Sequence, residues 1–178
     1  MSPSELLRSR IVDVPDFPTP GVVFKDISPL LADHDAFSAA VDAVVAHHVD
    51  HGVDKVVGIE ARGFILAAPA AYRLGAGFVP VRKPGKLPGP THETAYALEY
   101  GQNVLQVHRD AFSPGDRVLV VDDVLATGGT AAAAARLVQA AGAEVVGFSV
   151  LLELGFLSGS AALAAEHPGI PVHALLAY

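Results

Sequence analysis

Two aspartates and two glycines lie close together in the segment VLVVDDVLATGGT, which spans residues 118–130. Glycine permits positive φ angles and leaves the backbone bare, so successive N–H groups around Gly128 and Gly129 can converge on an anion. A helix predicted over residues 130–141 adds its own free N–H groups and the positive end of its dipole. The pattern therefore predicts a site for one phosphate group. That site consists of Ala126, Thr127, Gly128, Gly129 and Thr130.

The aspartate pair, Asp122 and Asp123, stands between an aliphatic run and this phosphate site. Carboxylates at such a place accept hydrogen bonds from sugar hydroxyls, or hold the water ligands of a Mg²⁺ ion bound to substrate oxygens. An isolated pair would more often cap a turn or face solvent. Next to a phosphate site, the pair indicates that the ligand is a sugar phosphate. The GxxxxGK[ST] lysine of triphosphate-binding loops is missing, which disfavours an NTPase of that class.

The cations needed by a phosphate site must be gathered locally. The chain has 12 Lys and Arg against 19 Asp and Glu, a formal net charge of -7, so its overall field repels anions. The same balance is a poor fit to nucleic-acid binding. The candidate cations are Arg62, Arg82, Lys83 and Lys86.

Side chains that commonly bind transition metals give a weaker signal. The chain has no cysteine, which excludes thiolate metal sites and thiol nucleophiles. His47 and His48 are adjacent, but neighbouring residues on a helix point about 100° apart, and no carboxylate completes a set. The sequence therefore predicts no direct metal ligation by protein side chains.

The elements that must position these residues follow an alternating order. Aliphatic strands are predicted within residues 55–63, 77–83, 103–108, 118–121, 145–152 and 171–178. Helices are predicted over residues 37–50, 64–75 and 130–141 and near Ser160. Such alternation predicts an α/β fold with a central, mainly parallel sheet flanked by helices. The loops after VVGI and VLVV should then meet at the carboxyl edge of the sheet, where ligands bind.

The length and hydropathy of the chain limit its organisation. A chain of 178 residues suits one domain. No apolar run reaches the length of a membrane span, and the first residues lack the apolar stretch of a signal peptide. We therefore expect a cytoplasmic protein without a membrane partner.

Prolines, glycines and polar residues dominate the segment PGKLPGPTHETAYALEYG, residues 84–101. This composition predicts a long exposed loop that returns through a hairpin. Because long loops in small domains often act as lids, residues 84–103 are expected to form a lid loop and hairpin, of which residues 84–95 are flexible when the site is empty and ordered when it is filled.

Five segments together resemble one known family. DFPTPGVVFKDISPLL, VVGIEARGF, GFVPVRKPGKLP, LEYG and VLVVDDVLATGGT have the order and spacing of type I phosphoribosyltransferases, and most closely of the adenine-specific members, over almost the whole chain. The resemblance implies the fold of that family with an N-terminal hood over residues 1–34. It implies transfer of a phosphoribosyl group from phosphoribosyl pyrophosphate (PRPP) to N9 of adenine, Mg²⁺ held through PRPP, and a homodimer. The lid residues GPTHETAYA and the end at Tyr178 depart from the family pattern.

The resemblance also implies a role for each candidate residue. The phosphate site would take the 5′-phosphate, and Asp122 and Asp123 the ribose hydroxyls. Arg62, Lys83 and Lys86 would bind pyrophosphate. Glu99 would handle the proton of adenine N9, with Tyr100 packed over the closed site.

Adenine selection is assigned to the segment GVVFKDI, residues 21–27. Phe24 would cover the base, and peptide groups at Val23 and Lys25 would pair with its 6-amino group and N1. Hypoxanthine reverses both hydrogen-bonding groups and would leave buried polar groups unpaired.

Three alternatives remain at this point. A non-catalytic PRPP-binding regulator would keep the phosphate site but would normally carry a nucleic-acid-binding element. A phosphorylation-receiver domain combines an acidic pair with an α/β sheet, but its pair follows the first strand, whereas this pair comes late. A transferase for hypoxanthine, guanine, xanthine or orotate is the closest alternative.

Overall fold

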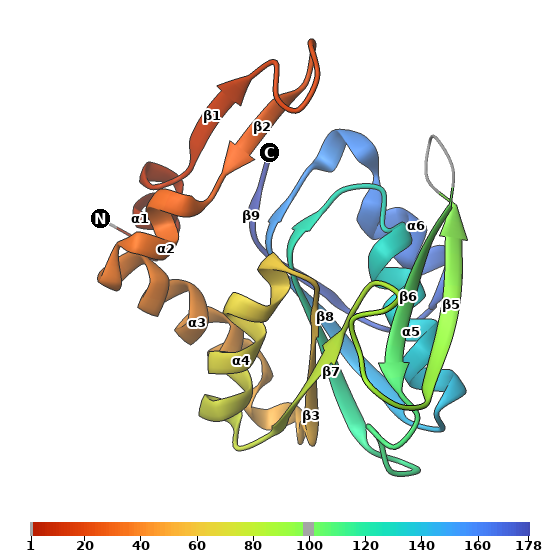
Figure 1. The fold of residues 1–178 in the computed structure, drawn as a ribbon. Helices are drawn as coiled ribbons and strands as arrows, with labels where there is room; N and C mark the ends of the chain where they lie inside the picture. Colours follow the sequence, from red (N-terminus) through yellow and green to blue (C-terminus); the bar gives the residue numbers. More distant parts are fainter. Residues whose placement is uncertain (1, 98–101) are drawn as a thin grey trace. The chain divides into compact units, whose positions relative to one another are not determined.

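The computed structural model describes residues 2–97 and 102–178 (Figure 1). The chain divides into two compact units, residues 1–43 and 44–178, which are described one after the other. The segment expected to form a hood, residues 1–34, lies within the first unit. Of the predicted site residues, Val23, Phe24 and Lys25 belong to the first unit, and the other described ones to the second.

The first unit combines short helices with a β-hairpin. Helix α1 (Pro3–Ser9) is capped by Ser2, whose Oγ accepts a hydrogen bond from the Glu5 N–H while the Ser2 N–H donates to the Glu5 carboxylate. Strands β1 (Val12–Pro15) and β2 (Val23–Asp26) pair antiparallel, and α2 (Ser28–Ala32) and α3 (His34–His48) follow, with residues 44–48 of α3 belonging to the second unit. The hairpin and α1 were not predicted, because four-residue strands show too little alternation to be recognised.

The second unit is built on a five-stranded parallel sheet of order β4-β3-β7-β8-β9. Its strands are β3 (Lys55–Ile59), β4 (Gly77–Val81), β7 (Arg117–Leu125), β8 (Glu144–Glu153) and β9 (Val172–Ala177). The predicted α/β class with a parallel sheet is thus confirmed. The aliphatic residues at positions 118–121 are at most 2% exposed, as expected for a central strand that is covered on both faces.

Helices lie on both sides of this sheet (Figure 1). Helix α4 (Arg62–Leu74) packs on β3 and β7, and α5 (Gly129–Ala140) and α6 (Gly159–Glu166) lie on the other side. Short 3-10 turns, η1 (Val49–His51) and η2 (Gly155–Leu157), follow α3 and β8. The alanines at positions 131–135 of α5 are all buried, which allows this helix to approach the sheet closely. None of the helices in the described part of the chain has the length and apolar character needed to cross a bilayer.

A separate antiparallel hairpin joins β4 to β7. Its strands are β5 (Thr91–Ala97) and β6 (Gln102–His108). The predicted hairpin is therefore present, but β5 begins at Thr91, so the irregular connection is shorter than the composition suggested. From Thr91 onward the chain pairs regularly with β6, although the residues just before Thr91 are rich in proline and glycine.

Three local predictions were wrong in detail. Strand β7 continues through Leu125, so Asp122 and Asp123 lie within the strand and not after it. Arg62 is the first residue of α4 and not a loop residue. Only Gly128 of the two adjacent glycines has a positive φ, of 89°, whereas Gly129 already begins the helix.

Candidate active site

The ends of three adjacent parallel strands bring the predicted polar residues together. Gly58 of β3 lies opposite Val121 of β7, so the residues at the end of β3 are neighbours of Asp122 and Asp123 within β7. Together with the end of β4 they line a cavity of about 350 Å³. Its lining includes Ile59, Glu60, Ala61, Arg62, Lys83, Tyr96, Asn103, Asp122, Asp123, Val124, Ala126 and Thr130. The carboxyl edge of the sheet thus carries the site, as predicted for a parallel α/β fold.

The predicted phosphate site forms the turn between β7 and α5. All five of its residues line one pocket. A Cβ atom at Gly128 would lie 2.9 Å from the carbonyl oxygen of Gly159, and the positive φ of Gly128 already disfavours other residues. Because Gly128 has no side chain to cap α5, the first N–H groups of that helix are left for a ligand. The turn therefore has the geometry of an anion site at a helix N-terminus.

The two aspartates occupy different environments. Asp123 is 4% exposed, and its Oδ2 lies 2.7 Å from Nε of Arg62. The Oδ1 atom of Asp122 accepts a hydrogen bond from the Asp123 N–H at 2.9 Å. Burial, and then the negative charge of Asp123, raise the pKa of Asp122 well above its usual range. Of the two carboxylates, Asp123 is thus the one whose charge is balanced directly by an arginine.

The start of α4 approaches the aspartates closely because residue 63 is a glycine. A Cβ at Gly63 would lie 2.9 Å from Oδ1 of Asp122 and 3.0 Å from the carbonyl oxygen of Val121. Any larger residue would push α4 away from β7. Arg62, which precedes Gly63, is held beside Asp123 by this close packing.

Glu60 organises the basic residues that follow β4, a role that the sequence analysis missed. Its carboxylate accepts hydrogen bonds from the Lys83 N–H at 2.9 Å and from Nε of Arg82 at 3.2 Å. Burial alone would raise the pKa of Glu60, but these hydrogen bonds and the nearby charges of Arg82 and Lys86 lower it below its usual range. An acid directly after a buried strand, in the quoted segment EARG, was the available signal.

The hairpin adds two further residues that the sequence analysis missed. The Thr130 hydroxyl donates to the Tyr96 hydroxyl at 3.2 Å, and Nδ2 of Asn103 donates to the same oxygen at 3.4 Å. Tyr96 and Asn103 are cross-strand partners in the hairpin. The alternation in HETAYA places Tyr96 on one face of β5, but nothing in the sequence shows that this face packs on α5.

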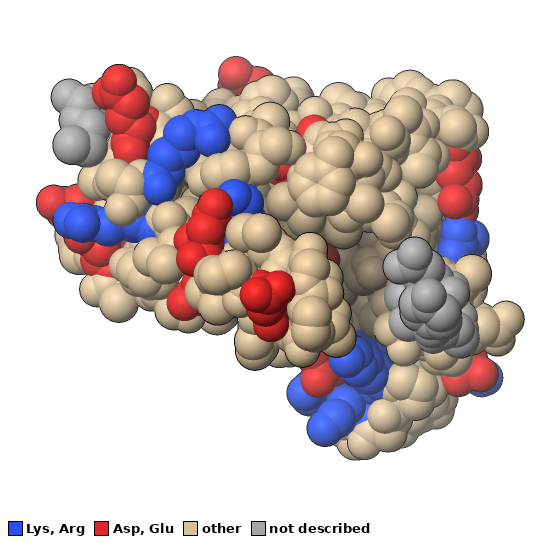
Figure 2. Space-filling model, turned by 90° about the horizontal axis from the view of Figure 1, so that it is seen from above, with Lys and Arg blue, Asp and Glu red and all other residues tan. Residues whose placement is uncertain are grey.

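The remaining predicted residues are distributed as follows. Lys83 lines the cavity. Lys86 is outside its lining, although its carbonyl oxygen accepts a hydrogen bond from Nη1 of Arg82 at 3.4 Å. Glu99 and Tyr100 lie outside the described residues. On the face seen in Figure 2, acidic and basic side chains are interspersed. An anionic ligand would therefore be attracted by the cations of the site itself and not by a basic surface around it.

The first unit has an apolar pocket of its own, lined by Val14, Phe17, Phe24 and Asp26. The rings of Phe17 and Phe24 meet edge to face, with centroids 5.1 Å apart. Nζ of Lys25 lies 2.7 Å from Oδ1 of Asp13. Phe24 thus combines a packing contact with a place in a concave surface.

Comparison with known proteins identifies the class of protein that has this fold and site. The model of the phosphoribosyl transferase domain matches residues 30–159. The chain therefore belongs to the phosphoribosyltransferase family.

Curated relatives of the chain carry a more specific name than the family model does. Adenine phosphoribosyltransferase of Acidothermus cellulolyticus is 64% identical over 162 residues, covering 91% of this chain and 92% of the relative. That of Streptomyces avermitilis is 60% identical over 173 residues, covering 97% and 95%. Within its family, the chain belongs with the adenine phosphoribosyltransferases.

Solved structures agree with this placement. The adenine phosphoribosyltransferase of Rhodothermus marinus matches with a TM-score of 0.93 and 49% identity, covering 99% of this chain and 98% of that one. The Saccharomyces cerevisiae enzyme matches with a TM-score of 0.90 and 36% identity, covering 98% of each chain, and its structure is a complex with an imino-altritol bisphosphate and adenine.

Proposed function

We propose that the protein transfers the 5-phosphoribosyl group of PRPP to N9 of adenine and releases AMP and pyrophosphate. The observation that carries this proposal is that a cavity lined by two aspartates and two cations adjoins the pocket of a helix-terminal phosphate site, with Asp122, Ala126 and Thr130 lining both. PRPP presents a monophosphate, two ribose hydroxyls and a pyrophosphate. Each of these groups has a chemically matching set of residues in the second unit.

The substrate groups are assigned as follows. The 5′-phosphate lies on the N–H groups of residues 126–130 and the hydroxyls of Thr127 and Thr130. Asp122 and Asp123 accept hydrogen bonds from the ribose hydroxyls. Pyrophosphate is bound by Arg62 and Lys83, with Lys86 joining from the lid segment.

The chemistry of the transfer suits this arrangement of charge. Departure of pyrophosphate from C1′ builds positive charge on the ribose ring and negative charge on the leaving group. The carboxylates of Asp122 and Asp123 stabilise the first charge, and the cations of Arg62 and Lys83 the second. Burial raises the pKa of Asp122, and a cationic ribose beside it would lower that pKa and favour the ionised carboxylate.

A Mg²⁺ ion fits the donor set of this cavity. Asp122 and Asp123 place carboxylate oxygens on its wall, and these are ligands that Mg²⁺ prefers, commonly through bound water and substrate phosphates. Because Asp123 is paired with Arg62, we assign the carboxylates to the water ligands of the ion and not to direct ligation. Bound with PRPP, the ion would neutralise charge on the leaving pyrophosphate.

Adenine is assigned to the segment around Phe24. The ring of Phe24 covers the base, and the peptide groups of Val23 and Lys25 pair with its 6-amino group and N1. The pocket beside Phe24 in the first unit supports this assignment. Glu99 accepts or relays the N9 proton, and Tyr100 packs over the closed site.

The proposal includes closure of the lid formed by residues 84–103, because a cationic ribose exposed to water would be hydrolysed. The contact between Tyr96 and Thr130 supports a link between the hairpin and the phosphate site. Ordering of residues 84–95 when PRPP binds would then protect their amide groups from hydrogen exchange.

We also propose a homodimer that acts in the cytoplasm. Ile65 and Tyr72 lie two turns apart on α4 and are 41% and 85% exposed, which supplies an apolar strip for a second copy. PRPP is highly charged and does not cross a bilayer unaided, which supports the cytoplasmic location. Light scattering tests the first expectation and cell fractionation the second.

A steady-state assay tests the reaction. The purified protein is incubated with PRPP, MgCl₂ and one base at a time: adenine, hypoxanthine, guanine, xanthine or orotate. We expect adenine to be consumed with a kcat/KM roughly 10⁴-fold above that of hypoxanthine, since the wrong base leaves buried polar groups unpaired. A kcat/KM for hypoxanthine within tenfold of the adenine value would overturn the adenine assignment. Release of pyrophosphate without consumption of any base would overturn the transferase itself.

A further inference from the structure

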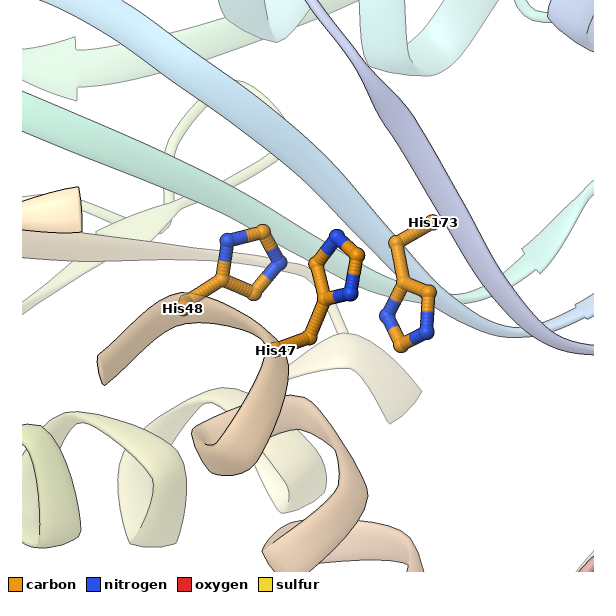
Figure 3. A group of neighbouring side chains, drawn as sticks. All are labelled: His47, His48 and His173. Carbon is orange, nitrogen blue, oxygen red and sulfur yellow. The ribbon is translucent and has the colours of Figure 1, made fainter. Parts of the chain in front are cut away.

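Four histidines gather in the second unit, away from the cavity described above. His47 and His48 end helix α3, His51 lies in η1, and His173 lies on β9. One ring nitrogen from each of His47, His48 and His173 lies within 4.8 Å of the others. The rings of His48 and His173 flank that of His47, and each presents a nitrogen toward it (Figure 3). Only the adjacent pair is recognisable from the sequence, because nothing in the sequence shows that β9 brings a third histidine beside it.

His48 is the fixed member of this group. It is 1% exposed, and its Nε2 atom has no hydrogen-bond partner among the described residues. A buried polar atom without a partner is unfavourable and is uncommon in proteins. The ring also packs against bare backbone, since a Cβ at Gly147 of β8 would lie 3.2 Å from its Cε1. The sheet thus accommodates an imidazole whose outer nitrogen is left for a ligand.

The other nitrogen of His48 is already held. Its Nδ1 lies 3.0 Å from Nδ1 of His51, a hydrogen-bond distance between two imidazoles. The carbonyl of His51 in turn accepts a hydrogen bond from Nε of Arg117 at 3.0 Å, which fixes the η1 turn. Metal-binding histidines typically use one ring nitrogen for the metal while the other is oriented by such a partner. His51 is therefore placed to orient His48.

The two remaining rings can complete the set. His173 lies beside the buried hydroxyl of Ser149, whose Oγ is 3.3 Å from its Nδ1. His47 stacks on His173, with centroids 3.7 Å apart and ring planes 2° from parallel. Parallel rings do not direct both lone pairs at one ion, so binding requires one of them to turn. His47 is exposed and its side chain has room to do so.

We propose that His47, His48 and His173 bind one divalent transition-metal ion, with water as a further ligand. Three imidazoles without a carboxylate or thiolate suit Zn²⁺, Ni²⁺, Co²⁺ or Cu²⁺, and do not suit Mg²⁺ or Ca²⁺, which prefer oxygen ligands. The site is separate from the one assigned to PRPP, because none of these histidines lines that cavity. The ion would join the end of α3 to strand β9 and stabilise the second unit, and its binding does not depend on the proposed transferase activity.

The test uses the metal-free full chain without an affinity tag. Calorimetric titration with ZnCl₂ should show one ion per chain, with a Kd of about 1 µM or lower, whereas MgCl₂ without PRPP should show no such site. Co²⁺ should give the visible absorption bands of a site with nitrogen ligands. Zn²⁺ should also raise the Tm, since it binds only the folded chain.

Variants locate the ion. His47→Gln changes an exposed side chain and should fold normally, yet weaken Zn²⁺ binding at least about tenfold, as should His173→Gln. His34→Gln is the matched control, because His34 lies on the same helix, its side chain is 91% exposed, and it is absent from the group. The proposal is overturned if the native chain binds no Zn²⁺. It is equally overturned if His47→Gln and His34→Gln bind Zn²⁺ alike, or if binding survives in the double variant of His47 and His173.

Discussion

Arg62 and Asp123 form an ion pair at the carboxyl edge of the sheet, with Nε and Oδ2 2.7 Å apart. The carboxylate is buried, whereas the arginine side chain remains 45% exposed. In the proposed reaction, pyrophosphate competes with Asp123 for this arginine. The pair therefore keeps both charges balanced while the site is empty and leaves Arg62 able to turn toward the substrate.

Arg62→Lys tests this assignment while keeping a positive charge next to Asp123. Lysine lacks the planar fork that binds two phosphate oxygens at once. We expect kcat/KM for PRPP to fall by roughly 10²-fold with little change in Tm, by analogy with the loss of one donor that stabilises transition-state charge. Arg73→Lys, in the last turn of the same helix, is the control and should retain its activity. Equal activity of the two variants would remove Arg62 from the pyrophosphate site.

Glycine substitutions separate the phosphate site from the fold. Gly128→Val places a branched side chain at the phosphate site, but it is not expected to leave the fold intact. The close approach to the Gly159 carbonyl and the positive φ make strain in the fold itself the expected result. Gly129 is the better position, because its Cβ would lie 3.5 Å from Cδ2 of Tyr96, an ordinary contact.

Gly129→Ala should therefore fold with an unchanged or slightly raised Tm, since alanine favours a helix by up to about 1 kcal/mol over glycine. Its methyl group would crowd a phosphate bound to the first N–H groups of α5. We expect the Kd for PRPP to rise by about tenfold or more, which is a loss of about 1.4 kcal/mol. Calorimetric titration of PRPP measures it, and native affinity in the folded variant would contradict the phosphate assignment.

The fold was largely predictable because the strands of the sheet are continuous aliphatic runs separated by clear helix stops. Gly52 and Gly75, for example, end their elements with left-handed φ angles, close to the predicted helix ends at residues 50 and 75. The phosphate turn was predictable because Gly128 and Gly129 have few other uses next to a buried strand. Three contacts could not be predicted, because each joins segments that are far apart in the sequence. These are the contacts of Tyr96 with Thr130, of Glu60 with Lys83, and of His173 with His47.

Acid should destabilise the protein through His48. Burial, followed by the charges of His47, His51 and His173, lowers the pKa of His48 to about 3 in the folded chain, against about 6.5 when unfolded. Between these values the unfolded chain binds more protons, so the free energy of unfolding falls as pH decreases from about 6.5 toward 3. One such group contributes a slope of up to about 1.4 kcal/mol per pH unit.

His48→Leu should remove this contribution. Urea unfolding from pH 7 to pH 4 in the presence of EDTA should show a shallower loss of stability than in the native chain. His34→Gln, with an exposed side chain, should follow the native profile. Parallel profiles of His48→Leu and the native chain would show that His48 does not titrate as its burial indicates.

Glu99, which lies outside the described residues, is the residue proposed to accept or relay the N9 proton of adenine. Glu99→Ala should lower kcat by roughly 10²-fold or more, as for loss of a general base, with a modest change in the Kd for PRPP. Glu93→Ala is a control that removes another carboxylate of the lid segment, because Glu93 lies on β5 and accepts a hydrogen bond from Gln106. If kcat in Glu99→Ala stayed at the native value, another group would have to accept the proton.

The last prediction distinguishes the base-binding and packing roles of Phe24. If its ring covers adenine, Phe24→Ala should raise the KM for adenine by about tenfold or more, since stacking of a base on an aromatic ring is worth roughly 1–3 kcal/mol. The Kd for PRPP should stay near its native value, because PRPP is assigned to residues of the second unit. Phe17→Ala removes the ring that meets Phe24 edge to face, and Phe156→Ala removes a ring that is 76% exposed in η2. If Phe24 covers the base, Phe24→Ala should raise the KM for adenine by more than any loss of folded protein explains. Phe156→Ala should change neither the KM for adenine nor the Tm. A purely structural role predicts instead that Phe24→Ala and Phe17→Ala lower the Tm alike and leave the KM for adenine within about twofold of native in the folded fraction.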